Sequence, residues 1–590
     1  MATLETPESV LVGRRGLEGI TGINSVGMPS WSTAELVWGM EFSVSISTPS
    51  AEIPRSTRWF VVVEQTYPRG NVKVFPAKVG GIDVTMPHQS RNDFGSSELP
   101  WRAGKLCLER PLAVLGMDTE EYSAPRRLAW HLGRAVEWVT AAATGTLRGP
   151  GERFELPELP AGRFAESIGF MEDAGTFASW TASSHQSGSA EFERCEGWWR
   201  VRHLGGVNLQ PAWGSWPTSP SRRKGVWLRL PGVPVVRNWQ FPETWGELRQ
   251  AVASLGGDLD KHLMSLIPEV RREREPLLLL IGAPMPQTWD GPMLEYHWWA
   301  IALSDLASPK RAPRGYRGKE GSLWRYDRQH AFADARPIQW VKSTNLAPHR
   351  IGARSHASAE IIESQILLLG VGALGSAVAE LLVRQGARRL VLVDDDTLEA
   401  GNLARHTLTL RDVRRPKVAS VAARLASVSP LAVIQGAKRE ATASGSLDDL
   451  PSPDVVIECT ADREALEALE SFGTSRPIHW FSVSVSVRAS RLYIFYSRSA
   501  AFPRMAFDAA IGPWVDRDWS EVDESTLSSE GPGCWHPLSP ARGDDVAALA
   551  AIAVRVVDEC VRGTGEDARL IVFERVEQNG EFGGFVRVRA

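Results

Sequence analysis

Alternating hydrophobic and polar residues mark the first part of the chain. Three β-rich runs separated by Pro, Gly and Ser predict an antiparallel meander. These runs are FSVSIS (42–47), RWFVVVE (58–64) and VKVFPAK (72–78). A helix is expected over 124–145, where apolar residues recur at helical spacing and Gly145 offers a C-terminal cap. Prolines interrupt the pattern in GERFELPELPAG, so we expect a first domain over 1–163.

The middle of the chain, 164–350, is rich in tryptophan and carries weaker patterns. Apolar runs predict buried strands over 227–235 and 275–285, and helical spacing predicts one helix over 244–267. The stretch 305–350 is basic, polar and irregular, as expected of a linker or a wrapping segment. We therefore expect a mixed central domain, either a linker or a degenerate adenylation domain.

Strand and helix patterns alternate in the last part, 351–590. Buried strands are expected over 364–370, 389–396 and 454–460, with helices over 372–386 and 415–428 between them. This βαβ order predicts a Rossmann-like, doubly wound parallel sheet, and thus an α/β multidomain protein overall.

The end of the chain departs from that order. The Pro/Gly/Ser-rich segment 500–533 shows no regular period and is expected to be irregular. A helix is expected over 544–561, and Asn579-Gly580 predicts a β-hairpin.

Composition narrows the class of protein. The chain has 590 residues, 43% of them hydrophobic and 23% charged, which excludes collagen, wholesale disorder and coiled coil. The net charge of −4 favours neither a nucleic-acid groove nor a membrane surface. We find no apolar run of the ~18–20 residues that a membrane helix needs and no signal peptide, so a cytoplasmic protein is expected.

Cysteine usage excludes two kinds of site. The five cysteines are odd in number and scattered, and therefore do not form a disulfide framework. The absence of any CxxC pair excludes a four-thiolate zinc site.

A glycine-rich turn lies between the first predicted strand and helix of the last domain. It contains Gly370, Gly372 and Gly375, which permit a tight turn and let backbone amides approach a phosphate. Asp394 follows 19 residues after Gly375, at the end of the next strand, where a carboxylate can bind ribose hydroxyls. The pattern predicts a nucleotide site, and the lack of a Walker A sequence excludes a P-loop ATPase.

The residues after Asp394 narrow the choice of nucleotide. Asp394 and Asp396 form a DxD, Asn402 and Arg405 lie in NLARH, and Lys417 follows. These elements, over about 364–500, resemble the ThiF/MoeB/ubiquitin-activating adenylation domain. One departure is His406, where that family usually has Gln.

The resemblance implies chemistry on ATP and Mg²⁺. It places Asp394 on the ribose and Asn402, Arg405 and Lys417 on the phosphates. Adenylating a carboxylate depends largely on positioning and on neutralising phosphate charge, which suits these residue types.

The resemblance also implies a magnesium ligand and a partner subunit. A hard oxygen ligand is expected after the strand at ECTAD, where Asp462 is the first choice and Glu458 the reserve. Domains of this family commonly pair as homodimers, and some borrow an arginine from the partner, for which Arg350 and Arg354 are candidates.

Cys534 lies in GPGCWHP, in the segment that connects the nucleotide strands to the last helix. A thiolate on such a loop can capture an adenylate as a thioester, and His536 is close in sequence. Cys459 and Cys560 fall in a predicted strand and helix and are expected to be small buried hydrophobes.

Cys107 lies in Gly104-Lys-Leu-Cys107-Leu, after the antiparallel meander and before a helix. This arrangement over about 1–160 resembles the active-site turn of ubiquitin-conjugating enzymes. The His-Pro-Asn triplet of that family is missing, although His88 and Asn92 lie 19 and 15 residues upstream. His131, in the following helix, is expected to be a packing residue more often than a base.

The three modules together predict a relay. A carboxyl adenylate would pass to Cys534, then to Cys107, and then to a target lysine. Fusion of the modules in one chain raises their effective concentration. The order resembles the bacterial fusion enzyme of CBASS antiphage operons, which implies a protein substrate ending in Gly, a cGAS-like nucleotidyltransferase.

Several alternatives remain open. The nearest is an enzyme for a dedicated bacterial ubiquitin-like protein. A sulfur-carrier adenylyltransferase would need only 351–590 and usually has the CxxC pairs missing here. An NAD oxidoreductase leaves Asn402, Arg405 and Lys417 unexplained, and a noncatalytic scaffold would not need two well-placed cysteines.

Overall fold

The computed structural model describes residues 5–588, apart from short gaps. The gaps are 18, 109–122, 161–165, 208–211, 272–276, 304–305, 311, 443–446, 524–528, 532–533, 538–539, 564 and 566. Side chains are not described for 524–539. The chain forms two compact units, one of residues 1–210 and 220–345 and the other of residues 211–219 and 346–590.

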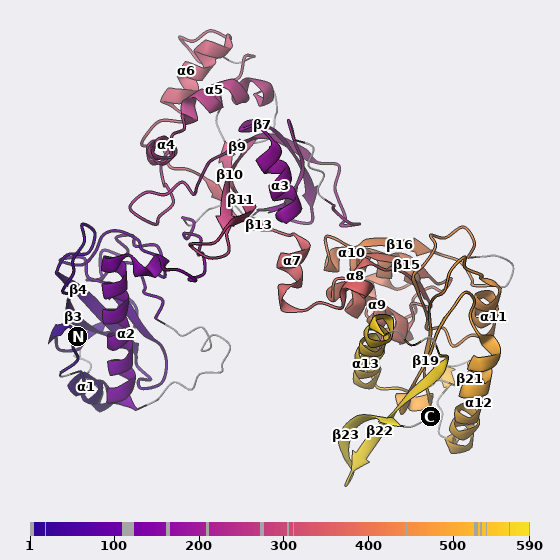
Figure 1. Ribbon diagram of the computed structural model, residues 1–590. Helices are drawn as coiled ribbons and strands as arrows, with labels where there is room; N and C mark the ends of the chain where they lie inside the picture. Colours follow the sequence, from indigo (N-terminus) through magenta and orange to yellow (C-terminus); the bar gives the residue numbers. More distant parts are fainter. Residues whose placement is uncertain are drawn as a thin grey trace. The chain divides into compact units, whose positions relative to one another are not determined.

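The N-terminal part of the first unit contains a small antiparallel sheet in the order β1-β3-β4-β5, with β2 beside β3 (Figure 1). The predicted meander is confirmed, since β3, β4 and β5 pair in sequence. The helix predicted over 124–145 is also confirmed, and Gly145 caps it at φ +75°. The elements are α1 (Glu8–Arg15), β1 (Ile23–Val26), β2 (Ser30–Ser32), β3 (Val37–Ser45), β4 (Ser56–Glu64), β5 (Val72–Pro76) and α2 (Ala124–Thr144).

An eight-stranded sheet forms the rest of the first unit, in the order β12-β11-β10-β9-β7-β8-β6-β13. Alternate residues of its strands face two separate cores, one beside α3 and one beside α4 and α5. The elements are β6 (Ser167–Phe170), α3 (Ala174–Ala182), β7 (Ser187–Cys195), β8 (Trp198–Leu204), β9 (Arg222–Arg229), α4 (Trp245–Ser254), α5 (Leu259–Val270), β10 (Leu277–Pro286), β11 (Met293–Leu303), α6 (Glu320–Gln329), β12 (Trp340–Val341) and β13 (Ser343–Asn345).

Two predictions for this region were wrong. The single helix expected over 244–267 is two helices, because Gly256 takes φ +79° and ends α4 before Asp258 caps α5. The stretch 305–350 is not irregular throughout, since it contains α6, β12 and β13. The division of this unit at residue 163 remains a prediction.

The second unit contains an eight-stranded sheet in the order β16-β15-β14-β17-β18-β19-β22-β23. Its elements include α7 (Pro348–Ile351), α8 (Ala359–Glu363), β14 (Gln365–Leu369), α9 (Ala373–Arg384), β15 (Arg389–Val393), α10 (Lys417–Val428), β16 (Val433–Ala437), β17 (Val455–Glu458), α11 (Arg463–Ser471), β18 (Ile478–Val485), β19 (Arg491–Ser499), α12 (Arg504–Glu521), β20 (Ser529–Gly531), β21 (Cys534–Pro537), α13 (Gly543–Arg562), β22 (Arg569–Gln578) and β23 (Glu581–Val588).

The helices cover both faces of this sheet, as a doubly wound fold requires. Helices α8, α9, α10 and α13 pack on the core that contains Ile366 and Leu368, and α11 and α12 pack on the core that contains Leu367 and Leu369. The predicted βαβ elements are confirmed, but the sheet is mixed. The neighbouring strands β16, β15, β14, β17 and β18 run parallel to one another. Strands β19, β22 and β23 each run antiparallel to the strand before them in the sheet.

The segment 500–533 is not irregular throughout, because it contains the 18-residue helix α12. Phe507 is its one buried residue and Pro513 interrupts it, which explains why no helical period was visible. The predicted C-terminal helix and hairpin are confirmed, with Asn579 at φ +54° and Gly580 at φ +79° between β22 and β23.

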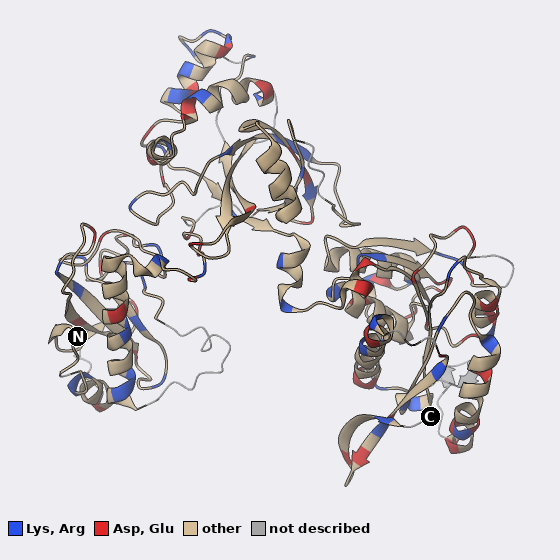
Figure 2. Ribbon diagram, in the orientation of Figure 1, with Lys and Arg blue, Asp and Glu red and all other residues tan. Residues whose placement is uncertain are grey.

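Charges of both signs are interspersed over the described elements (Figure 2). This mixture agrees with the near-neutral composition. Among the described residues, the helices are too short or too polar to cross a bilayer.

Candidate nucleotide site and cysteines

The glycine-rich turn lies where β14 ends, at the sheet edge where the parallel strands β15 and β17 also end. Gly370 takes φ +81°, and a Cβ there would lie 2.9 Å from the backbone nitrogen of Thr460. A Cβ on Gly375 would lie 1.9 Å from the carbonyl oxygen of Gly370. A Cβ on Gly372, directly before α9, would meet no atom within 4 Å. Packing therefore requires two of the glycines, and the third leaves open space at a helix N-terminus, where a phosphate can bind.

Asp394 connects this turn to the DxD sequence. Its carboxylate accepts hydrogen bonds from the backbone nitrogens of Val371 (2.8 Å) and Asp396 (2.9 Å). Burial raises the pKa of Asp394, and these hydrogen bonds oppose that rise. The predicted acid is thus placed at the glycine turn, as a ribose ligand must be.

Lys417 is brought to the same edge as the first residue of α10. Its Nζ lies 2.7 Å from Oδ2 of Asp396, and its backbone nitrogen donates to the Asp396 carbonyl. Its burial and its place at a helix N-terminus concentrate positive charge here, which favours an anion.

His406, the residue that departs from the family pattern, has a structural role that the sequence did not reveal. Its Nδ1 accepts from the backbone nitrogen of Leu408 at 3.2 Å, so its Nε2 carries the proton and donates to the Val371 carbonyl at 2.8 Å. Burial lowers the pKa of His406, which keeps the ring neutral. The side chain therefore fastens the NLARH segment to the glycine turn.

Asn402 lies in a short 3₁₀ helix, Ala400–Ala404, and Arg405 directly follows it. The Asn402 side-chain oxygen accepts from the backbone nitrogen of Glu399 at 3.0 Å. A Cβ on Gly543 would lie 2.8 Å from the carbonyl oxygen of Ala404, so the start of α13 packs against the segment that carries Arg405.

The two candidate magnesium ligands have different surroundings. Glu458 is fully buried, and its oxygens accept from Thr460, Ala461 and Ser482 at 2.5–2.8 Å, so it organises the turn after β17. Asp462 is exposed and caps α11 through the backbone nitrogen of Glu464 at 2.6 Å. Asp462 therefore fits a magnesium ion better, as one hard oxygen ligand beside phosphates.

A protein-only metal cage is not part of this arrangement. Among the described residues, no cluster of three or more His, Cys, Asp or Glu side chains could bind a metal ion. The phosphates of the nucleotide would have to supply the other ligands. Arg350 and Arg354 are exposed on α7 and the turn after it.

Cys534 begins β21, which pairs with β20 through Gly531. Its side chain lies outside the described residues. It precedes Gly543 by nine residues, which can span at most about 30 Å. The backbone therefore keeps Cys534 within that distance of Gly543, which packs against Ala404.

Cys107 is exposed, in a short ladder that the sequence did not predict. Its backbone nitrogen donates to the His88 carbonyl at 2.9 Å, and Ser90 donates to Lys105 in the same ladder. His88 takes φ +57°, and its Nδ1 lies 3.2 Å from Oε2 of Glu155. A non-glycine residue with a positive φ, in the left-handed region, is uncommon and is often found at functional sites.

Asn92 and His131 are occupied elsewhere. The Asn92 amide nitrogen donates to the carbonyls of Ile82 and Val84, and its oxygen accepts from Arg102 at 3.1 Å. This buried asparagine fixes the loop rather than offering a free amide. His131 is buried in α2 with Nδ1 2.9 Å from the Arg127 carbonyl, as expected of a packing residue.

The remaining cysteines lack the properties of nucleophiles. Burial raises the pKa of Cys195 to about 11, and burial also raises the pKa values of Cys459 and Cys560. Cys560 is buried in α13, as expected, whereas Cys459 directly follows β17 and is partly exposed, so the expectation of a buried strand residue is wrong for Cys459.

Comparisons with known proteins agree with this geometry. A family described as the Cap2 central linker domain matches residues 145–346, and the ThiF family matches residues 343–517. The Escherichia coli (strain K12) sulfur carrier protein ThiS adenylyltransferase is 34% identical over 113 residues, 18% of this chain and 45% of that protein. The solved structure of E. coli MccB with AMPCPP and MccA has a TM-score of 0.28 at 12% identity. The alignment covers 39% of this chain and 64% of that chain, and a similarity this weak indicates no function.

One relative matches nearly end to end. The ATP-dependent ubiquitin transferase-like protein Cap2 of Enterobacter hormaechei subsp. hoffmannii (strain UCI 50) is 30% identical over 563 residues, which cover 91% of this chain and 92% of that protein. Together with the ThiF match, this shows an enzyme of the ubiquitin-activating and conjugating type that uses ATP. The chain belongs to the Cap2 family of ATP-dependent ubiquitin transferase-like proteins.

Proposed function

We propose that this enzyme activates the C-terminal carboxylate of a protein, carries it first on Cys534 and then on Cys107, and joins it to a target lysine. One observation supports the proposal most. The glycine turn, Asp394 and Lys417 converge at one sheet edge, and the same chain carries an exposed Cys107.

The first step forms an acyl-adenylate. A carboxylate oxygen of the donor attacks the α-phosphorus of ATP, and pyrophosphate leaves. Asp394 binds the ribose, Arg405 and Lys417 neutralise phosphate charge as it develops, and Asn402 donates hydrogen bonds to the phosphates. Bound magnesium supplies Lewis-acid stabilisation of the phosphates, with Asp462 as its protein ligand.

Two thioesters and an amide follow. The Cys534 thiolate attacks the adenylate carbonyl and releases AMP. The Cys107 thiolate then attacks that thioester and frees Cys534. Finally a lysine amine attacks the Cys107 thioester, and an isopeptide bond forms as the thiolate leaves.

The activated protein is, in this proposal, a cGAS-like nucleotidyltransferase of a CBASS operon that ends in Gly. A dedicated bacterial ubiquitin-like protein is the second candidate, favoured by the name of the relative from Enterobacter. The genes next to this one would show which kind of donor protein the operon encodes. The donor is then the protein that supports pyrophosphate exchange by this enzyme.

The experiment is a nonreducing gel of each cysteine variant with labelled donor and ATP, with and without added thiol. Cys107→Ala should trap a thiol-labile adduct on Cys534 and yield no amide. Cys534→Ala should leave Cys107 unloaded yet still exchange pyrophosphate, since adenylation precedes thiolate attack. Normal charging of Cys107 in Cys534→Ala would contradict the two-step relay.

Matched variants test the nucleotide site in the same assay. Asp394→Ala and Lys417→Ala should abolish pyrophosphate exchange, because they remove the predicted ribose and phosphate ligands. Arg562→Met, at the exposed last residue of α13, is the control and should exchange normally. Normal exchange in both site variants would exclude adenylation at this edge.

We further propose a symmetric homodimer that pairs through the adenylation domain, to which Arg350 or Arg354 contributes across the interface, working in the cytoplasm. Light scattering at micromolar concentration checks the dimer, where a monomer mass would contradict it. Cell fractionation checks the compartment.

A further inference from the structure

Helix α12 leads directly into the segment that carries Cys534, and its final turn is attached by polar contacts. The helix runs back along β19, with Phe507 against Phe495 (ring centroids 5.4 Å) and Trp514 against Tyr493 (6.0 Å). Of its residues, all of which the structure describes, Phe507 alone is buried. Burial of apolar surface therefore fastens the start of α12 and not its end.

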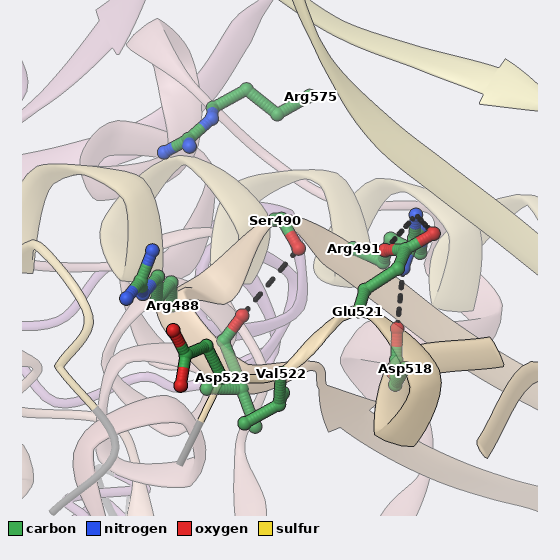
Figure 3. A pocket seen from close by; sticks show the side chains of 9 residues that line it. Arg488, Ser490, Arg491, Asp518, Glu521, Val522, Asp523 and Arg575 are labelled. Carbon is green, nitrogen blue, oxygen red and sulfur yellow. Dashed lines mark hydrogen bonds and ion pairs between the residues drawn. The ribbon is translucent and has the colours of Figure 1, made fainter. Parts of the chain in front are cut away.

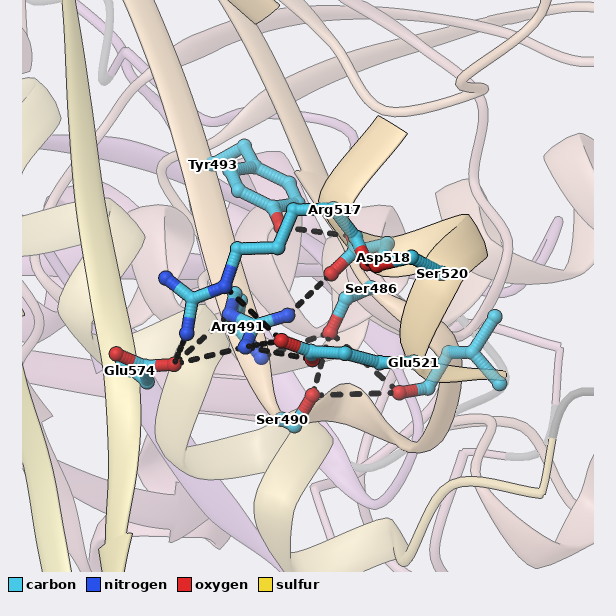
Figure 4. A network of polar contacts seen from close by, with 10 residues as sticks. Ser486, Ser490, Arg491, Tyr493, Arg517, Asp518, Ser520, Glu521 and Glu574 are labelled. Atoms are coloured by element: carbon cyan, nitrogen blue, oxygen red, sulfur yellow. Dashed lines mark hydrogen bonds and ion pairs between the residues drawn. The ribbon is translucent and has the colours of Figure 1, made fainter. Parts of the chain in front are cut away.

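Arg491, the first residue of β19, provides the attachment at that end (Figure 4). Its Nη1 lies 2.5 Å from Oδ1 of Asp518, and its Nη2 lies 2.7 Å from Oε2 of Glu521. Its Nε donates to Oε1 of Glu574, on β22, at 2.9 Å. The Arg491 side chain is 5% exposed, so its buried guanidinium joins the last turn of α12 to two strands, and the more exposed Arg517 adds an ion pair from α12 to Glu574 at 3.2 Å.

The composition of that last turn explains why it depends on Arg491. Asp518 and Glu521 are acids at a helix C-terminus, which carries a partial negative charge. Glu521 pairs with Arg517 of the helix itself at 2.9 Å, whereas Asp518 pairs with Arg491. Without a counter-charge these acids destabilise the helix end. Tyr493 also donates to Oδ2 of Asp518 at 2.7 Å, from the same strand as Arg491. A local arrangement that disfavours helix is thus offset by contacts across the fold.

The two ends of the Cys534 segment are both attached near the edge of the sheet where the parallel strands have their carboxyl ends. Glu521 ends α12, and Cys534 follows 13 residues later. At the other end, Gly543 packs against Ala404. Arg491 follows the connection between β18 and β19, and β18 runs parallel to β17 and ends at the same edge as the glycine turn.

We propose that Arg491 is a positioning residue for thioester formation. By fixing the last turn of α12 to β19 and β22, it sets the point at which the Cys534 segment leaves the sheet, and so the access of Cys534 to the adenylate. This inference rests on the proposed function. It assigns Arg491 no contact with ATP or with the donor.

The size of the effect follows from segment length. About 21 residues lie between α12 and α13; if α12 were released back to Phe507, about 35 residues would separate Phe507 from α13. Effective concentration falls roughly as the −3/2 power of length, which gives about a twofold loss. Loss of the direction in which the segment leaves the sheet adds to this, so Cys534 charging should slow about two- to tenfold.

The test compares two half-reactions in Arg491→Met, made in the Cys107→Ala background. Pyrophosphate exchange should stay within about twofold of the parent, because the adenylate forms without Cys534. The single-turnover rate of the thiol-labile adduct on Cys534 should fall. Hydrogen exchange should report weaker protection of the amides at the end of α12.

Conservative and reciprocal variants separate positioning from simple loss of structure. Arg491→Lys retains the charge and should restore at least half of the charging rate. Asp518→Asn leaves Arg491 in place and should also slow the charging of Cys534, but by less than Arg491→Met does. It provides the test if Arg491→Met does not fold. A cavity of about 290 Å³ beside the cluster (Figure 3) can hydrate the freed carboxylates, which favours folding of the variants.

Two outcomes would overturn the inference. One is unchanged Cys534 charging in Arg491→Met although the end of α12 has lost protection. The other is a parallel fall of exchange and charging, which would place Arg491 in the folding or adenylation machinery. Failure of the proposed function is distinct, since the parent with intact Arg491 would then carry no adduct on Cys534.

Discussion

At the scale of single residues, the three glycines of the nucleotide turn make different demands. Gly372→Ala should leave the melting temperature within about 2 °C, because the new Cβ meets no atom within 4 Å, yet it should weaken ATP binding about tenfold or more by filling the space for a phosphate. Gly375→Ala should lower both the melting temperature and the affinity for ATP, since its Cβ would overlap the Gly370 carbonyl. Thermal unfolding and pyrophosphate exchange measure the two effects. Normal exchange by Gly372→Ala would contradict a phosphate at this turn.

Glu172 is a buried acid that the relay does not use. Its Oε1 accepts from the indoles of Trp180 (2.9 Å) and Trp298 (2.7 Å), and burial raises the pKa of its carboxyl to about 7. Because the pKa of Glu172 in the folded protein lies above the ordinary glutamate value of 4.5, folding favours the protonated form. The contribution of Glu172 to the free energy of unfolding is therefore fully present below about pH 4.5. It is lost as the pH rises through about 7, and the loss is up to roughly 3 kcal/mol.

Glu172→Gln should remove that pH dependence, since the amide keeps the oxygen that the two indoles use and does not ionise. The melting temperature of the parent should fall by several degrees between about pH 5 and pH 8 relative to that of the variant. Tryptophan fluorescence is a direct probe, because Trp180 and Trp298 contact the carboxylate. Equal pH dependence in the two proteins would show that Glu172 does not ionise in this range.

At the scale of elements, the sequence predicted the helices and strands whose own residues carry the signal. Helix α2 and strand β14 have regular apolar patterns, and the hairpin β22–β23 has Asn-Gly at its turn. Helix α12 was missed because its polar residues Asp518 and Arg517 bind residues of β19 and β22, while the helix has no regular apolar face of its own. Helices α4 and α5 were merged because apolar spacing continues across the glycine that separates them.

The candidate site shows the same limit. The spacing of a strand, a turn and the next strand indicated Gly370 and Asp394, since these are local features, whereas Lys417 was indicated by the resemblance to the adenylation family. The roles of His406 and Glu458 depend on partners that the fold brings from elsewhere, Val371 and Ser482, which lie 35 and 24 residues away. Arg491, whose partners lie 27 to 83 residues away, carried no local signal.

At the scale of the whole molecule, the chain passes between its two units three times. Residues 211–219 belong to the second unit although residues on both sides belong to the first. There, Ser215 donates to the Ala432 carbonyl beside β16, and a Cβ on Gly214 would lie 2.2 Å from that same oxygen, so a glycine is needed at this contact. Cys107 and Cys534 lie in different units of this one chain.

Covalent connection makes a prediction about the second thioester transfer. If Cys534 and Cys107 of one molecule react with each other, the reaction is unimolecular, and its rate constant should not change when the enzyme is diluted about 100-fold with donor and ATP kept saturating. A mixture of Cys107→Ala and Cys534→Ala, each assembled before mixing, is the control, because transfer between separate assemblies should slow in proportion to dilution. The measurement is the appearance of the Cys107 adduct after ATP is added. A parent rate that falls with dilution as steeply as the mixture does would mean that the acyl group passes between molecules, and the fusion of the modules would then have no kinetic role.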